Sequence, residues 1–181
     1  MAEEKFCKNL DGLIKLFIDT IDWLKSEGVK TSLNTVILTF GHQYVLNSPK
    51  HEQITKFIEK SYEYWPAIKE RNEFFLMENA GILFDGIPAQ YISEVTRLLS
   101  EKDENGDFLI PANPTRDSIW KYLEVLVKNS IYYIHEYRCP DRVKGGYKNS
   151  YFGMVKDLEG NIITKGISVR ENALLWGITI N

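Results

Sequence analysis

The chain has 181 residues, of which 44% are hydrophobic and 13% aromatic, so it contains enough apolar material for a folded core and is not a disordered chain. Its formal net charge of −3 gives no general attraction to nucleic acid or to an anionic membrane surface. The two cysteines, Cys7 and Cys139, are too few for a disulfide framework and favour an intracellular protein with reduced thiols.

Apolar residues at helical spacing dominate the start of the chain. Residues 3–27 place apolar side chains three and four positions apart, and Gly28 is well placed to end that helix. Residues 31–46 repeat the pattern, but several of them are β-branched, so a strand is the alternative. Because the pattern is too long for a single strand, we predict a second helix, whose apolar residues are Leu33, Val36, Ile37, Phe40 and Tyr44.

Prolines divide the next part of the chain. Ser48-Pro49 predicts the start of a helix over 49–64, because serine caps helices and proline is tolerated at their first position. Trp65-Pro66 breaks or kinks this helix, since proline lacks the backbone N–H and restricts the residue before it. The apolar pattern then resumes over 67–79.

Two more helices and a turn are predicted before the tail. Asp85-Gly86-Ile87-Pro88 opens a helix that runs to about Ser100. The polar segment 101–113, around Asn105-Gly106, predicts a turn or a short hairpin. Asn113-Pro114 repeats the cap-plus-proline signal and predicts a long helix that continues to Ile134.

The composition changes at Arg138. Residues 1–137 contain 15 Lys and Arg against 21 Asp and Glu, whereas residues 138–181 contain 7 against 4 and are rich in glycine. In this tail, 150–156 and 162–170 have the pattern of strands, with 174–180 as a possible third. The prediction is a mainly α, α+β protein. An irregular bundle of five or six helices would occupy residues 1–137, and a basic linker with a small antiparallel β-meander would occupy residues 138–181.

The basic stretch at this boundary is the one candidate binding site that the sequence offers. Its cations could contact phosphates, its glycine pair would let a ligand approach the backbone, and its tyrosine could stack on a base. The alternative is a helix C-terminus, where cations favour the negative end of the dipole, followed by a flexible linker. The candidate residues are Arg138, Arg142, Lys144, Gly145, Gly146, Tyr147 and Lys148.

No pattern in the sequence predicts a catalytic centre, a metal site or a cofactor. His51-Glu52 lacks the second histidine of a zinc-binding helix, and residues 103–107 depart from a calcium loop at the glycine and at the final glutamate. We expect His42 and His51 at helix ends or on the surface. The sequence has no phosphate-binding loop and no dinucleotide fingerprint, so it leans towards a protein that is not an enzyme.

Several segments of the helical part resemble one group of viral proteins. The segments follow one another in this order: Leu16 to Leu24, then Asn47-Ser48-Pro49 with Ile54 to Phe57, then Trp65 to Phe75, and finally Ile119-Trp120-Lys121-Tyr122-Leu123. The order is similar to that in uncharacterised helical proteins of large nucleocytoplasmic DNA viruses. The resemblance covers residues 10–130 and does not extend to the basic tail. It implies an α-helical, virus-encoded protein and supplies no activity or catalytic residue.

These observations together predict a structural or protein-interaction protein. Its partner would be another protein or a second copy, bound through the tail or through an aromatic surface. The alternative is a nucleic-acid-binding accessory protein that uses residues 138–170 to contact phosphates. The acidic N-terminus is unlike a secretory signal, and no apolar run reaches membrane-spanning length. We therefore expect no membrane partner and a cytoplasmic location, in the host cytoplasm or the virion if the protein is viral.

Overall fold

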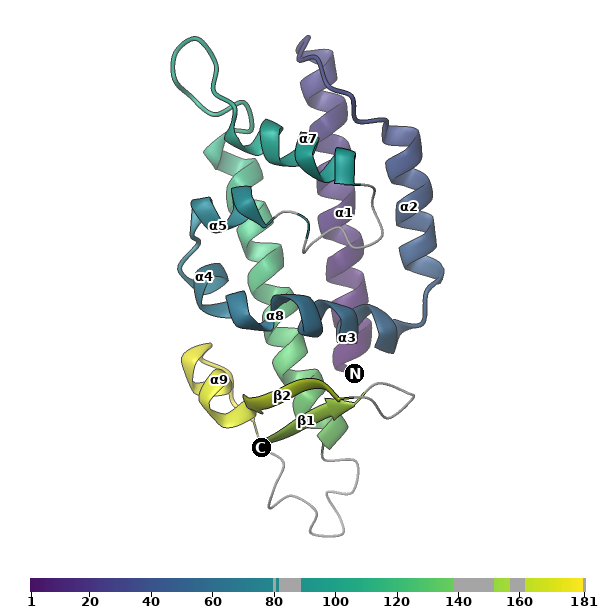
Figure 1. Ribbon diagram of the computed structural model, residues 1–181, viewed down its shortest axis with the longest axis vertical. Helices are drawn as coiled ribbons and strands as arrows, with labels where there is room; N and C mark the ends of the chain where they lie inside the picture. Colours follow the sequence, from purple (N-terminus) through teal and green to yellow (C-terminus); the bar gives the residue numbers. More distant parts are fainter. Residues whose placement is uncertain (80, 82–88, 139–151, 157–161, 181) are drawn as a thin grey trace.

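The protein is mainly helical (Figure 1). The computed structural model describes residues 1–79, 81, 89–138, 152–156 and 162–180. No helix within these ranges is both long enough and apolar enough to cross a membrane.

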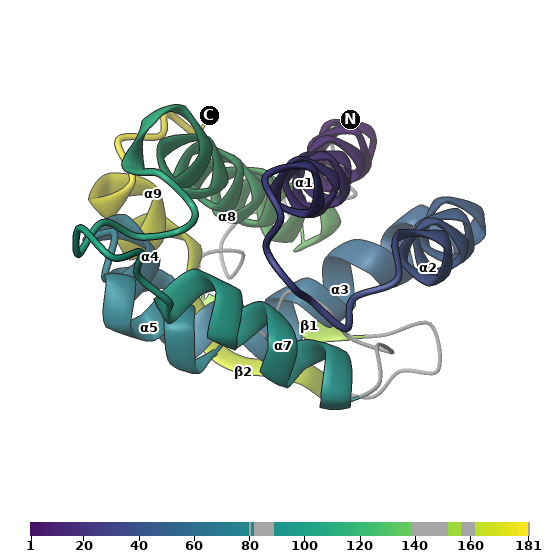
Figure 2. The same ribbon diagram turned by 90° about the horizontal axis from the view of Figure 1, so that it is seen from above.

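Two long antiparallel helices, α1 (Ala2–Ser26) and α8 (Asp117–Arg138), lie side by side along the length of the molecule (Figures 1 and 2). The Ala2 backbone N–H donates to Glu136 Oε2 at 3.1 Å and so joins the start of α1 to the end of α8. The predicted helix over 3–27 is confirmed, and the chain leaves it at Gly28, where φ is +83°. Its buried residues recur at helical spacing and are Ala2, Phe6, Leu13, Phe17, Thr20, Ile21 and Leu24.

α2 (Thr35–Asn47) lies at one edge of the molecule, beside α1 and away from α8 (Figure 2). The helix predicted here is therefore confirmed, and the strand alternative is wrong. Asn34 stabilises the first turn, because its side-chain oxygen accepts a hydrogen bond from the Val36 N–H at 2.9 Å.

Three short helices follow, and proline shapes the first two. α3 (Lys50–Ser61) begins directly after Pro49 and ends in a 3₁₀ turn, Tyr62–Tyr64. α4 (Trp65–Lys69) starts at the Trp65-Pro66 pair, so the break predicted at this proline is confirmed.

The single helix predicted over 67–79 is wrong. The chain leaves helical geometry at Arg71, whose φ is +52°, and starts again as α5 (Glu73–Glu78). Asn72 caps the new helix, because its side-chain oxygen accepts a hydrogen bond from the Phe75 N–H at 3.2 Å. An asparagine that can cap a helix therefore interrupts a pattern that hydrophobic spacing alone would continue.

α7 (Ala89–Ser100) crosses the upper part of the molecule in Figure 1 and leads into a hairpin. The hairpin is closed by a hydrogen bond from the Leu109 N–H to the Glu101 carbonyl at 2.9 Å, and it turns at Gly106, where φ is +86°. The predicted turn is thus confirmed. A π-helical turn, Ala112–Arg116, connects the hairpin to α8.

The described part of the tail contains one pair of strands and one helix. β1 (Phe152–Lys156) pairs antiparallel with β2 (Ile162–Ser168). The third strand predicted over 174–180 is wrong, because α9 (Val169–Leu175) covers the start of that segment. The Ser168 hydroxyl caps α9 by accepting from the Glu171 N–H at 3.2 Å.

The buried residues of the C-terminal helix explain the error and show where the tail packs. Val169, Ala173 and Trp176 are four and three positions apart, which is helical spacing, and all three are buried. They belong to the same core cluster as residues of α1, α3, α4, α5, α7 and α8.

Candidate functional site

The basic stretch predicted as a binding site falls outside the described residues. α8 ends at Arg138, of whose side chain nothing is described. The other six candidates lie between residues 139 and 151: Arg142, Lys144, Gly145, Gly146, Tyr147 and Lys148. The site predicted from them remains a prediction.

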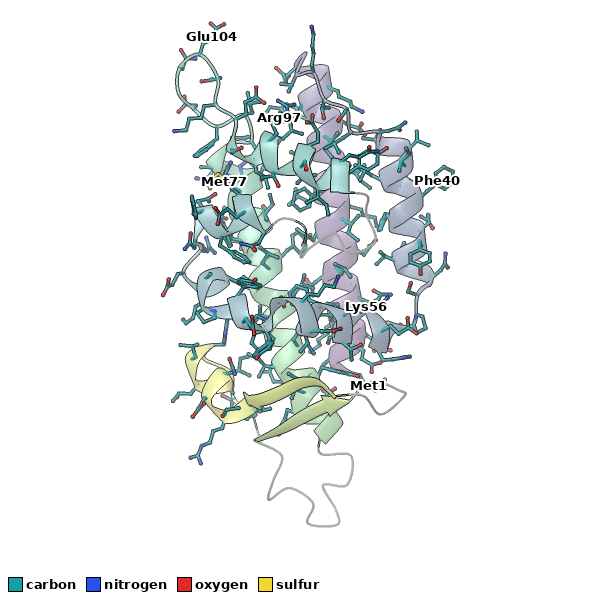
Figure 3. All side chains as sticks on the ribbon, in the orientation of Figure 1. Met1, Phe40, Lys56, Met77, Arg97 and Glu104 are labelled. Atoms are coloured by element: carbon teal, nitrogen blue, oxygen red, sulfur yellow. The ribbon has the colours of Figure 1, made fainter. Side chains whose placement is uncertain are left out.

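A contiguous apolar surface covers the outer side of α2. Val36, Phe40 and Tyr44 are spaced four residues apart and are 59%, 71% and 73% exposed, and Ile37 beside them is 44% exposed. Figure 3 shows Phe40 at the edge of the molecule, pointing away from α1. We call these four side chains the α2 face.

The chain segment that carries the α2 face has no charged side chains of the Lys, Arg, Asp or Glu type. From Thr31 to Pro49 the chain contains no Lys, Arg, Asp or Glu. The polar residues exposed on α2 are Thr39, Gln43 and Asn47, all of them neutral. Surface helices normally place charged side chains towards solvent, and a helix that is apolar on most sides is usually buried. α2 thus has the composition of a buried helix and the position of an edge helix.

The inner side of α2 is fixed by a buried histidine. His42 is 6% exposed, and its Nε2 lies 2.6 Å from Asp11 Oδ1 on α1. Asp11 also accepts a hydrogen bond from Lys15 Nζ at 2.9 Å. Partial burial raises the pKa of Asp11, but the hydrogen bonds from Lys15 and His42 outweigh it and hold that pKa below its usual value. This contact sets the rotation of α2, so the α2 face must point outwards.

The position of His42 corrects the expectation that it lies at a helix end or on the surface. It occupies the middle of α2 and is buried against α1. The physical reason is its paired carboxylate, because a buried imidazole is tolerated when a hydrogen-bonding partner satisfies it.

A small hollow adjoins the C-terminal end of the α2 face. Its volume is about 100 Å³, and it lies between α1, α2 and α3. Leu10, Ile14 and Phe57 give it apolar walls, while Tyr44 belongs both to the hollow and to the α2 face. Glu52, Lys56 and Lys60 also line it, so the α2 face continues into a concave site with both apolar and charged walls.

The corner between α2 and α3 beside this hollow is closed by one side chain. Gln53 Nε2 donates to the carbonyl of Val45 at 2.7 Å and to that of Ser48 at 2.9 Å, which satisfies two carbonyls at the end of α2.

The apolar pattern of residues 31–46 correctly predicts a helix, but most of its apolar side chains do not pack in the core. Of its five apolar residues only Leu33 is buried, at 1% exposure, and the other four form the α2 face. The signal that distinguishes the two cases is the missing charge from Thr31 to Pro49, which leaves α2 without a solvent-facing charged side.

A second polar cluster, around Arg116, is structural. The Arg116 side chain is buried, its Nε donates to the Ile110 carbonyl at 2.9 Å, and its guanidinium also binds the Leu99 carbonyl and the Glu73 carboxylate. The guanidinium lies 4.1 Å from the centre of the Phe108 ring. These contacts join the hairpin to α5, α7 and the start of α8.

Possible metal ligands do not cluster in the described residues, and the cysteine among them is Cys7. No group of three or more His, Cys, Asp or Glu side chains in them could hold a metal ion. Burial raises the pKa of the Cys7 thiol to about 11, although Lys50 opposes this, so Cys7 is a neutral thiol at physiological pH.

Comparisons of the chain with models of protein families, with curated proteins and with solved structures found no match.

Proposed function

We propose that the chain is a non-enzymatic interaction protein that binds another protein through the α2 face. The observation that carries this proposal is an uncharged helix at the edge of the fold with four large apolar side chains exposed together. Exposed apolar patches of this kind mark interaction sites in soluble proteins.

The energetic case rests on the two aromatic residues. A phenylalanine or tyrosine side chain has roughly 150–250 Å² to bury. Phe40 and Tyr44 leave 71% and 73% of their surface exposed in the single chain. Covering them would contribute several kcal/mol at about 25 cal/mol per Å², before the cost of association.

The type of partner follows from the apolar character of α2. Charged rims steer association and select partners by potential, but α2 itself supplies no Lys, Arg, Asp or Glu, and the charges beside Tyr44 are those of Glu52, Lys56 and Lys60, which line the hollow. Recognition would depend on shape and on the aromatic anchors, with the hollow beside Tyr44 as the place where a partner side chain inserts. A helix of the partner packed along α2 fits these requirements.

The resemblance to helical proteins of large nucleocytoplasmic DNA viruses suggests where this protein–protein interaction takes place. If the chain is virus-encoded, we propose that it acts as a structural or accessory component of the virion or of the infected cell.

Site-specific photocrosslinking inside cells that express the protein tests the proposed function. A photoreactive phenylalanine analogue replaces Phe40 in one variant and Phe74 in another. Phe74 lies on α5 and is 63% exposed, so it is a matched control for residue type and exposure. We expect position 40 to form a crosslink to a polypeptide and position 74 to form none. Equal crosslinking at both positions, or none at position 40, would refute the proposal.

A second candidate function rests on the only concentrated basic stretch in the sequence, residues 138–148. We propose nucleic-acid binding as the alternative, with these cations on phosphates. At about 50 mM salt, a DNA duplex should bind the wild type and should not bind the Arg142→Ala/Lys144→Ala/Lys148→Ala variant. No binding by the wild type under these conditions would eliminate this candidate.

A further inference from the structure

We infer that the partner at the α2 face is a second copy of this chain, bound so that Phe40 of each copy packs against Gly41 of the other. The inference rests on the proposed function and adds the identity of the partner and the contact that specifies it.

Gly41 is an unusual residue for its position in the helix. It lies in the middle of α2, where glycine is the least favourable residue apart from proline. A Cβ added at this position would meet no atom of the described residues within 4 Å, so their packing does not require glycine there. Its presence is explained if another chain approaches the helix at this point.

The neighbours of Gly41 give this approach a shape. On a helix surface, residues four apart form ridges, and neighbouring ridges enclose grooves. Val36, Phe40 and Tyr44 form one such ridge, and Ile37, Gly41 and Val45 occupy the next. Because Gly41 has no side chain, the second ridge has a gap directly beside Phe40. A protruding ring and a matching gap therefore lie next to each other.

This arrangement is self-complementary. In a dimer with two-fold symmetry every such contact occurs twice. If one residue of the first copy contacts a different residue of the second copy, the same two residues also meet with the copies exchanged. A two-fold axis that passes between Phe40 and Gly41 places each Phe40 ring in the gap of the other copy. The two α2 helices then run antiparallel, which also aligns their dipoles favourably.

The distribution of charge leaves the α2 segment open to a second copy. The chain has a net charge of −3, so two copies repel each other over most of their surface. The segment from Thr31 to Pro49 has no Lys, Arg, Asp or Glu, and it lies at the edge of the fold. Two copies that meet along this segment bring no like charges of the segment itself opposite each other.

The available area suits a weak, reversible dimer. With Phe40 and Tyr44 more than seven-tenths exposed, the α2 face offers on the order of 500 Å² per copy. Two copies would bury on the order of 1,000 Å² in total, which is at the lower limit for a specific interface. Dimerisation should therefore depend on protein concentration in the micromolar range.

Sedimentation velocity of the purified full chain, at concentrations from about 1 to 200 µM, tests the inference. We expect the wild type to pass from monomer to dimer in this range. Phe40→Glu should raise the dissociation constant more than tenfold, because it places a charge in the apolar contact. Phe74→Glu, the matched control, should leave the dissociation constant unchanged.

Gly41→Ala is the decisive variant, because it should weaken the dimer without destabilising the monomer. The added methyl group fills the gap and should raise the dissociation constant about tenfold, while the unfolding temperature of the monomer stays the same or rises. A wild type that remains monomeric at 200 µM, or a dimer insensitive to either Phe40→Glu or Gly41→Ala, overturns the inference. A monomeric wild type whose position 40 still crosslinks to a different polypeptide would overturn it and leave the proposed function standing.

Discussion

Arg116 joins several elements of the fold through one buried side chain. Its guanidinium is buried and serves two backbone carbonyls, those of Ile110 and Leu99, together with the carboxylate of Glu73. Without it the buried carbonyls would lose their donors, which costs about 1–3 kcal/mol for each group left unpaired.

We therefore expect Arg116→Met to lower the free energy of unfolding by about 3 kcal/mol or more, measured by urea denaturation. Lys121→Met is the control, because Lys121 lies five residues further along the chain, on α8, with 65% of its side chain exposed. It should change stability little. Similar losses in the two variants would contradict the structural role given to Arg116.

Two glycines on helices provide a paired prediction. A Cβ at Gly12 would lie 2.6 Å from the Tyr122 hydroxyl oxygen, so α1 and α8 need glycine to pack here, whereas a Cβ at Gly41 meets nothing. Gly12→Ala should lower the free energy of unfolding by about 1 kcal/mol, because displacing the ring outweighs the gain in helix propensity. Gly41→Ala should raise it by up to about 1 kcal/mol in the dilute monomer. Thermal unfolding would measure both changes. If the unfolding temperature rose in both variants, the close packing of Gly12 against Tyr122 would be contradicted.

At the scale of the elements, Glu94 connects α7 to the segment between α1 and α2. Its carboxylate accepts hydrogen bonds from Arg97 Nη2 at 2.8 Å and from the Ser32 N–H at 3.3 Å. The Arg97 hydrogen bond is the largest influence on it, and together with the bond to Thr31 it lowers the pKa of Glu94 to about 2 despite burial.

This pKa predicts a pH dependence. A carboxyl group with a lower pKa in the folded state stabilises the fold above its unfolded value of about 4.5 and loses that contribution as the pH falls towards 2. Glu94→Gln should therefore make the loss of stability between pH 5 and pH 2 shallower, by on the order of 1 kcal/mol after solvent screening. Urea denaturation across this range would show it. If the slope of the free energy of unfolding against pH were unchanged, Glu94 would not stabilise the contact between α7 and the segment that joins α1 to α2.

The elements also show what the sequence could and could not predict. Local signals located most helices, since caps and prolines act through the backbone within a few residues. They did not predict the break at Asn72 or the helix at Val169, where a capping side chain and burial decided between two patterns. They could not show that Phe40 and Tyr44 are exposed, because the same spacing fits a core stripe and a docking face. That distinction depends on which side of α2 meets α1, and this is set by the distant contact between Asp11 and His42.

At the scale of the whole molecule, Trp176 tests whether the C-terminal helix belongs to the main core. It is 6% exposed and clusters with buried residues of the other helices, while its indole Nε1 has no hydrogen-bond partner among the described residues. Trp176→Ala should cost about 3 kcal/mol and keep a single unfolding transition. Trp176→Phe should cost much less, since it keeps apolar contact and removes an unpaired N–H group. A small effect of the alanine variant would indicate that this helix is separate from the core.

The function proposed for this protein depends on what covers the α2 face. The most direct measurement uses the purified chain with a photoreactive phenylalanine at position 40, followed by mass spectrometry of the crosslinked peptides. The structure leads us to expect a crosslink between two copies, to the peptide of α2 that contains Gly41. A position 40 that reacts only with solvent at a protein concentration of about 200 µM would contradict this account.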